Sequence, residues 1–310
     1  MDKGSRATGH LMAFICSFFW GTAFIASKVM VSGDFAPNQI IVTRVALAFL
    51  ILTLVTRKYV PLGGLAGVKR DRWLIPAGFL GAALYYLLES TAMQYTYATN
   101  VSLIVATSPL FSTVFDRFLP AEDRKPLSRS FFYGLALCLI GVTLVILNGS
   151  RLRLNPTGDF IALLASITWA AYSFCVNKAQ RVNEAQPEPL SQLLFTRRVM
   201  FYGLLLLIVV FLCGGAHYDP AMLRGRYLAV LLYLSALPSA LCYWLWSRVI
   251  SRIGMLNASL YVDLTTLIAA LAGVVLLHEE LTLMSASGMI AIIIGLIITQ
   301  GFLNMLRRRS

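Results

Sequence analysis

The chain alternates long apolar runs with short polar segments that carry most of its charges. A helix needs about 20 residues to cross a hydrocarbon core about 30 Å thick, and the apolar runs have this length. They are continuous and do not alternate polar with apolar residues, which favours helices over the strands of a membrane barrel. The pattern predicts ten transmembrane helices, at residues 11–31, 38–56, 73–94, 98–119, 131–148, 158–178, 191–213, 227–247, 256–277 and 286–306.

The composition also indicates a membrane protein. Of the 310 residues, 58% are hydrophobic and 13% are charged, whereas about 25% of the residues in a soluble domain are charged. The formal net charge is +12, but the Lys and Arg residues lie in short clusters between apolar runs, where they set membrane topology. We therefore expect the lipid bilayer as a partner, and no nucleic acid.

The sequence lacks the signatures of common enzymes. The five cysteines stand singly in apolar runs without CxxC spacing, so neither a disulfide framework nor a metal site is indicated. His278, Glu279 and Glu280 lack the second histidine of a zinc protease motif, and the chain has no P-loop for ATP. We expect no metal, no cofactor and no enzymatic activity.

The second half of the chain repeats features of the first. The stretch YTYATNVSLIVATSPL returns later as RIGMLNASLYVDLTTL, which aligns Asn100 with Asn257 at an offset of 157. Trp20 aligns with Trp169 at an offset of 149. Such self-similarity indicates two homologous halves of five helices each. The halves are residues 1–150 and 151–310.

An odd number of helices per half predicts that the second half enters the membrane in the opposite orientation. With the N-terminus inside, the inner segments hold eighteen Lys and Arg residues and the outer segments hold four. This asymmetry predicts that both termini are cytoplasmic. The first run is too long for a cleavable signal peptide, so we expect a multi-pass protein of the bacterial inner membrane.

Several repeated motifs resemble the drug/metabolite transporter superfamily, and specifically its EamA-type members. Each half opens with a helix that carries Gly and Trp, and each repeats Asn-x-Ser-Leu before its fourth helix. The turns PAEDRKP and LHEELTL precede Gly-containing fifth helices in the same way. The resemblance covers the whole chain. It implies a secondary transporter that exports amino acids, other metabolites or drugs.

Ionisable residues within the predicted spans are the first candidates for function, because charges in hydrocarbon are costly and usually face protein or water. Their depth along each helix predicts two clusters, each with one acid and two bases. We interpret the clusters as two alternating gates, each closed when the other is open. The alternative is that they are static ion pairs near the interface. The outer cluster is Lys28, Arg44 and Glu89, and the inner cluster is Arg197, Arg198 and Asp263.

Aromatic residues predict a substrate cavity. Trp20 and Trp169 lie near the middle of their helices, whereas Trp in membrane proteins usually lies at the interface. Packing between helices is the alternative for each aromatic side chain, and helix capping is the alternative for the two Asn residues. The other predicted cavity residues are Phe24, Tyr85, Tyr86, Asn100, Ser102, Tyr172, Tyr243, Trp244, Asn257, Ser259 and Tyr261.

Prolines and glycines suggest where helices bend and pack. Pro109 and Pro238 lie inside predicted spans, where a missing backbone hydrogen bond produces either a hinge or a fixed kink. Two glycine pairs, each seven residues apart, predict smooth faces for close helix packing. These pairs are Gly134 with Gly141 and Gly288 with Gly295.

Together these features predict an exporter of amino acids or related metabolites that works by alternating access. Proton-coupled efflux of cationic drugs and metabolite exchange are the alternatives among carriers. A channel is disfavoured because no filter loop or ring of charges is evident. Protons are the candidate coupling ion, through Glu89 or Asp263. We expect a small-molecule substrate and a monomer or homodimer.

Overall fold

The computed structural model describes residues 3–31, 33–56, 70–95, 98–118, 129–147, 156–214, 218–277 and 283–299. Within these ranges every regular element is a helix. The helices of the first half are α1 (Lys3–Val31), α2 (Pro37–Thr56), α4 (Leu74–Ala77), η1 (Gly78–Leu84), α5 (Tyr85–Tyr95), α6 (Ala98–Val105), α7 (Ser108–Asp116) and α8 (Arg129–Leu147). Those of the second half are α9 (Pro156–Glu184), α10 (Gln192–Cys213), η3 (Pro220–Leu223), α11 (Gly225–Leu234), η4 (Ser235–Leu241), α12 (Cys242–Ile253), α13 (Met255–Ser259), α14 (Tyr261–Leu277) and α15 (Leu283–Thr299).

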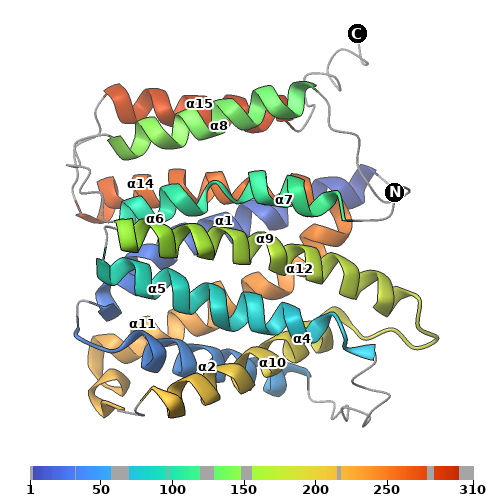
Figure 1. Ribbon diagram of the computed structural model, residues 1–310, viewed down its shortest axis with the longest axis vertical. Helices are drawn as coiled ribbons and strands as arrows, with labels where there is room; N and C mark the ends of the chain where they lie inside the picture. The colour runs from blue at the N-terminus through green and yellow to red at the C-terminus, as the bar shows by residue number, and fades with distance from the viewer. Residues whose placement is uncertain are drawn as a thin grey trace.

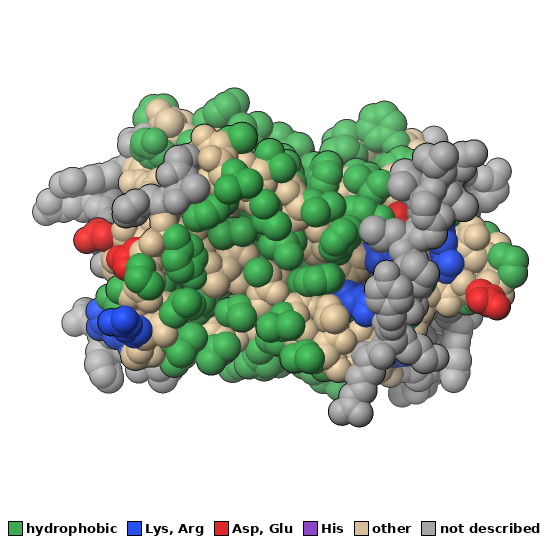
Figure 2. All heavy atoms as spheres, turned by 90° about the horizontal axis from the view of Figure 1, so that it is seen from below, with side chains coloured by type: hydrophobic (Ala, Val, Ile, Leu, Met, Phe, Trp, Pro, Cys, Tyr) green, Lys and Arg blue, Asp and Glu red, His purple; other side chains and the backbone are tan. Residues whose placement is uncertain are grey.

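Six of the described helical stretches are long and apolar enough to cross a membrane by length and composition. The other four predicted spans coincide with shorter helices, which are α6, α7, α8, α13, α14 and α15. Residues 119, 148 and 300–306 of these spans lie outside the described ranges. Figure 2 shows hydrophobic side chains over the middle of one face, with charged side chains towards the two ends. The six stretches are Arg6–Val31, Pro37–Thr56, Leu74–Tyr95, Pro156–Glu184, Gln192–Cys213 and Gly225–Ile253.

Two of these stretches contain a seven-residue π-helix, at the same place in each half. The π-helix η4 begins 157 residues after η1 begins. The repeated Asn-x-Ser-Leu motif has the same offset of 157 residues. Pro238 lies inside η4, where it has no backbone N–H to donate. A π-helix leaves some backbone carbonyls without their usual helical partners, and such segments frequently occur at functional sites.

Two other predicted spans are broken rather than continuous. The span 98–119 forms α6 and α7, which meet at the turn formed by Ala106 and Thr107. Pro109 occupies the first turn of α7, where proline is tolerated. In the second half, α12 ends at Gly254, whose φ of 81° is readily adopted only by glycine. The chain then continues into α13 and α14.

The helices form layers, with α8 and α15 paired at one edge and α2 and α10 near the other (Figure 1). Small residues allow the α8–α15 pair to approach closely. A Cβ atom added at Gly141 would lie 2.6 Å from the carbonyl oxygen of Gly288, and one added at Gly295 would lie 2.7 Å from that of Gly134. The glycine pairs therefore lie at the contact between these two helices, as the sequence predicted.

Candidate functional site

A cavity lies between the two halves of the chain. Helix α1 contributes four residues at the spacing of one helical face, and α2, α5, α6, α9 and α14 complete the wall. The space within it that water can enter is about 40 Å³. The lining residues are Trp20, Ala23, Phe24, Ser27, Arg44, Tyr85, Tyr86, Glu89, Ser102, Val105, Trp169, Val262, Thr265 and Thr266.

Aromatic rings from both halves form and support part of the wall of this cavity. Trp20 and Trp169 meet edge to face with ring centroids 5.0 Å apart, and Trp246 packs 5.0 Å from Trp20. Tyr85 lies 4.9 Å from Trp169. The indole Nε1 of Trp20 donates a 2.9 Å hydrogen bond to the carbonyl oxygen of Pro238. One of the backbone acceptors in the π-helical segment η4 is therefore used to fix a cavity residue.

Two of the predicted cavity residues lie behind this wall. Tyr172 and Tyr243 are each 1% exposed, and neither contributes to the cavity lining. The Tyr243 hydroxyl donates to the carbonyl oxygen of Gly81, at a distance of 2.5 Å. Gly81 lies 157 residues before Pro238, so equivalent carbonyls of η1 and η4 each accept a bond from an aromatic side chain. Tyr172 and Tyr243 support the wall rather than facing the cavity in this conformation.

Two charged residues of the predicted outer cluster line the cavity together. Arg44 is 3% exposed, and its Nε donates to Ser239 at 2.7 Å while its Nη2 donates to Tyr86 at 3.1 Å. The guanidinium carbon also lies 4.1 Å from the ring centroid of Tyr86. Glu89 is 9% exposed and close enough to Arg44 for electrostatic interaction. The side chain of the third predicted member, Lys28, lies outside the described part of the structure.

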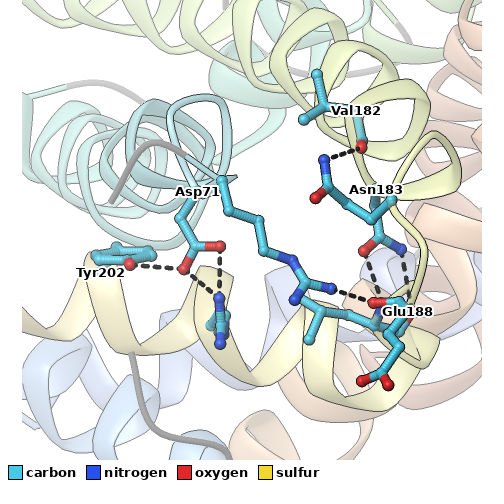
Figure 3. A network of polar contacts seen from close by, with 9 residues as sticks. Asp71, Val182, Asn183, Glu188 and Tyr202 are labelled. Atoms are coloured by element: carbon cyan, nitrogen blue, oxygen red, sulfur yellow. Dashed lines mark hydrogen bonds and ion pairs between the residues drawn. The ribbon is translucent and has the colours of Figure 1, made fainter. Parts of the chain in front are cut away.

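The predicted inner cluster is wrong in its pairing. Arg198 forms its ion pair with Asp71, at 2.5 Å and 2.6 Å to the two carboxylate oxygens, and Tyr202 donates to Asp71 at 2.8 Å (Figure 3). Arg197 donates to the hydroxyl of Thr56 at 2.9 Å. Asp263 lies elsewhere because α14 packs on α1 and α8, whereas α10 packs on α2, α4 and η1.

The Asp71–Arg198–Tyr202 network lies at the opposite end of the bundle from Glu89. Asp71 and Glu89 are 18 residues apart along one largely helical stretch, which corresponds to roughly 27 Å. Arg70 binds the same end to the loop between α9 and α10, through a 2.7 Å bond to the carbonyl oxygen of Glu188 (Figure 3). Polar contacts therefore hold together the end of the bundle that is remote from Glu89.

Asp263 is fully buried next to the thiol of Cys138. Neither of its carboxylate oxygens has a hydrogen-bond partner of ordinary geometry in the described part of the chain. It does not line the cavity, although Val262 and Thr265 beside it do. Among the residues that the structure describes, no group of three His, Cys, Asp or Glu side chains is placed to hold a metal ion.

The repeated Asn-x-Ser motif does not cap its helix in the second half. Asn257 lies inside α13, where its amide donates to the carbonyl oxygen of Ile253 at 2.9 Å. Gly254 occupies the cap position instead, since its positive φ allows the chain to reverse there. Asn100 lies within α6, and its side chain is outside the described part of the structure.

The remaining predicted residues differ in position. Ser102 lines the cavity, whereas Ser259 is buried and donates to the carbonyl oxygen of Leu256 at 2.8 Å. Tyr261 shares a 2.9 Å hydrogen bond with His10. Trp244 packs under Arg248, with the guanidinium carbon 4.2 Å from its ring centroid. Only Ser102 of these four contributes to the cavity wall.

Sequence reasoning missed Asp71, Tyr202 and Ser239. Asp71 stands between two arginines before a predicted span, where a solvated loop is the ordinary expectation. Tyr202 and Ser239 look like common residues of an apolar helix. The usable signal was the spacing of Arg198 and Tyr202, four residues apart on one helical face, which allows both to bind one acceptor.

Comparisons with known proteins agree with this architecture. The model of the EamA-like transporter family matches the chain twice, over residues 7–147 and 156–300. An uncharacterized transporter of Archaeoglobus fulgidus is 26% identical over 296 residues and spans 94% of this chain and 96% of its own length. A probable amino-acid metabolite efflux pump of Salmonella typhimurium is 26% identical over 300 residues, with 95% of each chain covered.

A solved crystal structure has the same fold, with a TM-score of 0.74 and 18% sequence identity. The similarity covers 98% of this chain and 99% of the other. At this identity the likeness concerns the fold alone. The two consecutive matches of the family model cover most of the sequence. The chain is therefore a multi-pass membrane protein that belongs to the EamA-like transporter family.

Proposed function

We propose that this protein is a secondary transporter that exports amino acids or related small metabolites by alternating access. The observation that carries the proposal is the aromatic cavity, which combines residues of both halves and contains a buried Arg and a buried Glu. Such a mixture of aromatic walls and a few polar groups is typical of sites for small organic molecules. The name of the Salmonella relative supports the same substrate class.

The proposed architecture is ten transmembrane helices in two inverted halves, with both termini cytoplasmic. The two matches of the family model and the π-helices at equivalent positions support it. In this topology α1 runs outwards, so the cavity lies in the outer half of the membrane. The Asp71–Arg198–Tyr202 network then lies at the inner end.

In this account the structure corresponds to a state closed on the inside. The aromatic wall and the Asp71–Arg198 pair separate the cavity from the inner end. In this account the cavity widens when it binds substrate. In the next step of the cycle the inner network would open and the outer half would close, because the two halves of such a transporter can exchange conformations.

Counterflow in proteoliposomes tests this proposal. Vesicles with purified protein are preloaded with unlabelled amino acids and given trace amounts of labelled leucine and phenylalanine. A carrier accumulates label transiently above its equilibrium level, whereas a channel only speeds equilibration. Protein-free vesicles are the control. Label uptake that is no faster with preloading than without it would contradict amino-acid transport, and the same vesicles would then be tested with a lipophilic cation.

Protons are the proposed coupling ion, with Glu89 and Asp263 as the candidate carriers. Both are buried carboxylates. Glu89 lies in a candidate membrane span and Asp263 in a shorter apolar helix, where an ionised acid is costly. Counterflow with and without a pH gradient tests this part of the proposal. If Glu89→Gln and Asp263→Asn both keep the response of the wild type to the gradient, neither residue is the carrier.

A further inference from the structure

The cavity holds two buried charges of opposite sign that do not form a direct ion pair. Arg44 and Glu89 are the charged residues among those that line it in the described part of the chain. The ion pairs found among the described residues do not join them. A buried charge is normally paired directly. Each of these two groups is therefore available to a ligand.

Arg44 keeps donors that its protein contacts do not use. A guanidinium has five N–H groups in a planar fork, and the contacts to Ser239 and Tyr86 use two of them. The stacked Tyr86 ring and the Ser239 hydroxyl fix the plane of the fork. These neutral neighbours orient the guanidinium but do not neutralise its charge. A planar carboxylate is the ligand that such a fork binds best.

Glu89 offers the complementary acceptor. No group among the described residues donates a hydrogen bond to its carboxylate. The carboxylate oxygens are also not fully buried, since they do not belong to the buried polar atoms that lack a partner. They therefore reach the cavity. An ammonium group placed there would form a charge-assisted hydrogen bond, which is stronger than a neutral one. The hydroxyls of Ser27, Thr265 and Thr266 line the same space and add neutral partners.

We propose that Arg44 and Glu89 bind the two ends of a zwitterionic substrate, Arg44 its carboxylate and Glu89 its ammonium group. This inference rests on the proposed function and adds the way in which the site recognises its substrate. An organic cation would leave Arg44 unmatched, and an anion would leave Glu89 unmatched. The aromatic faces of Trp20 and Trp169 and the apolar Val105 suit the side chain of an amino acid.

Competition in the counterflow assay tests this inference. Unlabelled leucine, leucinamide and N-acetyl-leucine compete with labelled leucine, and the equivalent phenylalanine compounds are the second series. The amide lacks the carboxylate charge, and the acetyl compound lacks the ammonium charge. In the wild type we expect each to compete ~10- to 100-fold more weakly than the amino acid, since each loses one charged hydrogen bond.

Charge-neutral variants then assign each end of the ligand. In Arg44→Gln the preference for leucine over leucinamide should fall at least ~10-fold, while the preference over N-acetyl-leucine persists. Glu89→Gln should show the converse pattern. Glu184→Gln and Arg224→Gln make the same charge changes at exposed positions and should keep both preferences. General damage to the protein would lower transport without changing one ratio selectively.

Variants that no longer transport are assayed by ligand quenching of tryptophan fluorescence, because Trp20 and Trp169 line the cavity. Arg44→Lys and Glu89→Asp keep the charges and should retain the two preferences in weakened form. Wild-type counterflow combined with unchanged ratios in both neutral variants would overturn the inference and leave the proposed function intact. An absence of counterflow in the wild type would overturn the proposed function and the inference with it.

Discussion

Asp71 carries a buried charge that depends on its neighbours. It is 0% exposed, and it binds Arg198 through both carboxylate oxygens and Tyr202 through one. Transfer of two charges from water costs several kcal/mol per ion, and good geometry with extra hydrogen bonds offsets this cost. The network is therefore sensitive to loss of either charge. Its position at one end of the bundle makes it the proposed inner closure.

The substitution Asp71→Asn should destabilise the protein by about 3–5 kcal/mol, because it leaves the Arg198 charge buried without its partner. Tyr202→Phe removes one hydrogen bond to a charged group and should cost about 1.5–3 kcal/mol. Thermal unfolding in detergent measures both effects. Glu184→Gln, at an exposed site, is the matched control. If Asp71→Asn melts together with Glu184→Gln, the ion pair does not stabilise this conformation.

At the residue scale, sequence reasoning found groups but not all of their partners. Trp20, Trp169, Arg44 and Glu89 could be predicted because aromatic and charged side chains are unusual at these depths. The partner of Arg198 could not, since it depends on which helices are neighbours in space. A charge at a given depth has several candidate partners until the packing of the helices is known.

The π-helices are the most distinctive elements of the fold. They lie at equivalent positions of the two halves, and each uses a carbonyl to bind an aromatic side chain of a different helix. Helices bend at such segments because the regular backbone ladder is interrupted. In the proposed transport cycle they are the places where the third helix of each half changes shape. The Trp20–Pro238 bond couples this change to the cavity.

Replacement of Pro238 by Ala restores a backbone N–H and should convert η4 towards an α-helix. The carbonyl that accepts from Trp20 then becomes engaged in the helix. We expect slower counterflow with unchanged or higher thermal stability. Pro220→Ala removes a proline from the exposed segment η3 and is the control. Equal counterflow by Pro238→Ala and Pro220→Ala would show that the π-helix is only a fixed kink.

Hydropathy predicted where the long apolar helices lie but not their internal breaks. Continuous apolar sequence predicts a helix of sufficient length, and each predicted span meets one or more helices. The break between α6 and α7, the π-helices and the Gly254 turn arise from packing between helices. Pro109 and Pro238 mark two of these places. The π-helix η1 has no proline within it, so its sequence carries no comparable signal.

In the proposed transport cycle, one cavity is exposed alternately at the two ends of the bundle. The described conformation places the cavity towards Ser27 and Glu89, and it places the ion-pair network at the other end. Repeats and aromatic depth in the sequence led us to expect two halves and a cavity between them. They did not predict which end is closed, because closure depends on contacts between helices that are distant in sequence.

Cysteine accessibility in proteoliposomes tests whether the cavity opens alternately at the two ends. Ser27→Cys reports on the cavity, and Ser247→Cys, at a residue 1% exposed on the helix that contacts Gln192, reports on the proposed inner side. The background carries Cys213→Ser, since Cys213 is exposed and the other four cysteines are buried. An impermeant maleimide is applied to either face, with and without a saturating amino acid.

Without substrate, we expect labelling of Ser27→Cys from the outer face and protection of Ser247→Cys. During exchange, labelling of Ser27→Cys should fall while Ser247→Cys becomes reactive from the inner face. Asp71→Asn should produce the same shift without substrate. Labelling of the two positions that varies independently, or reaction of both from one face at the same time, would contradict alternating access.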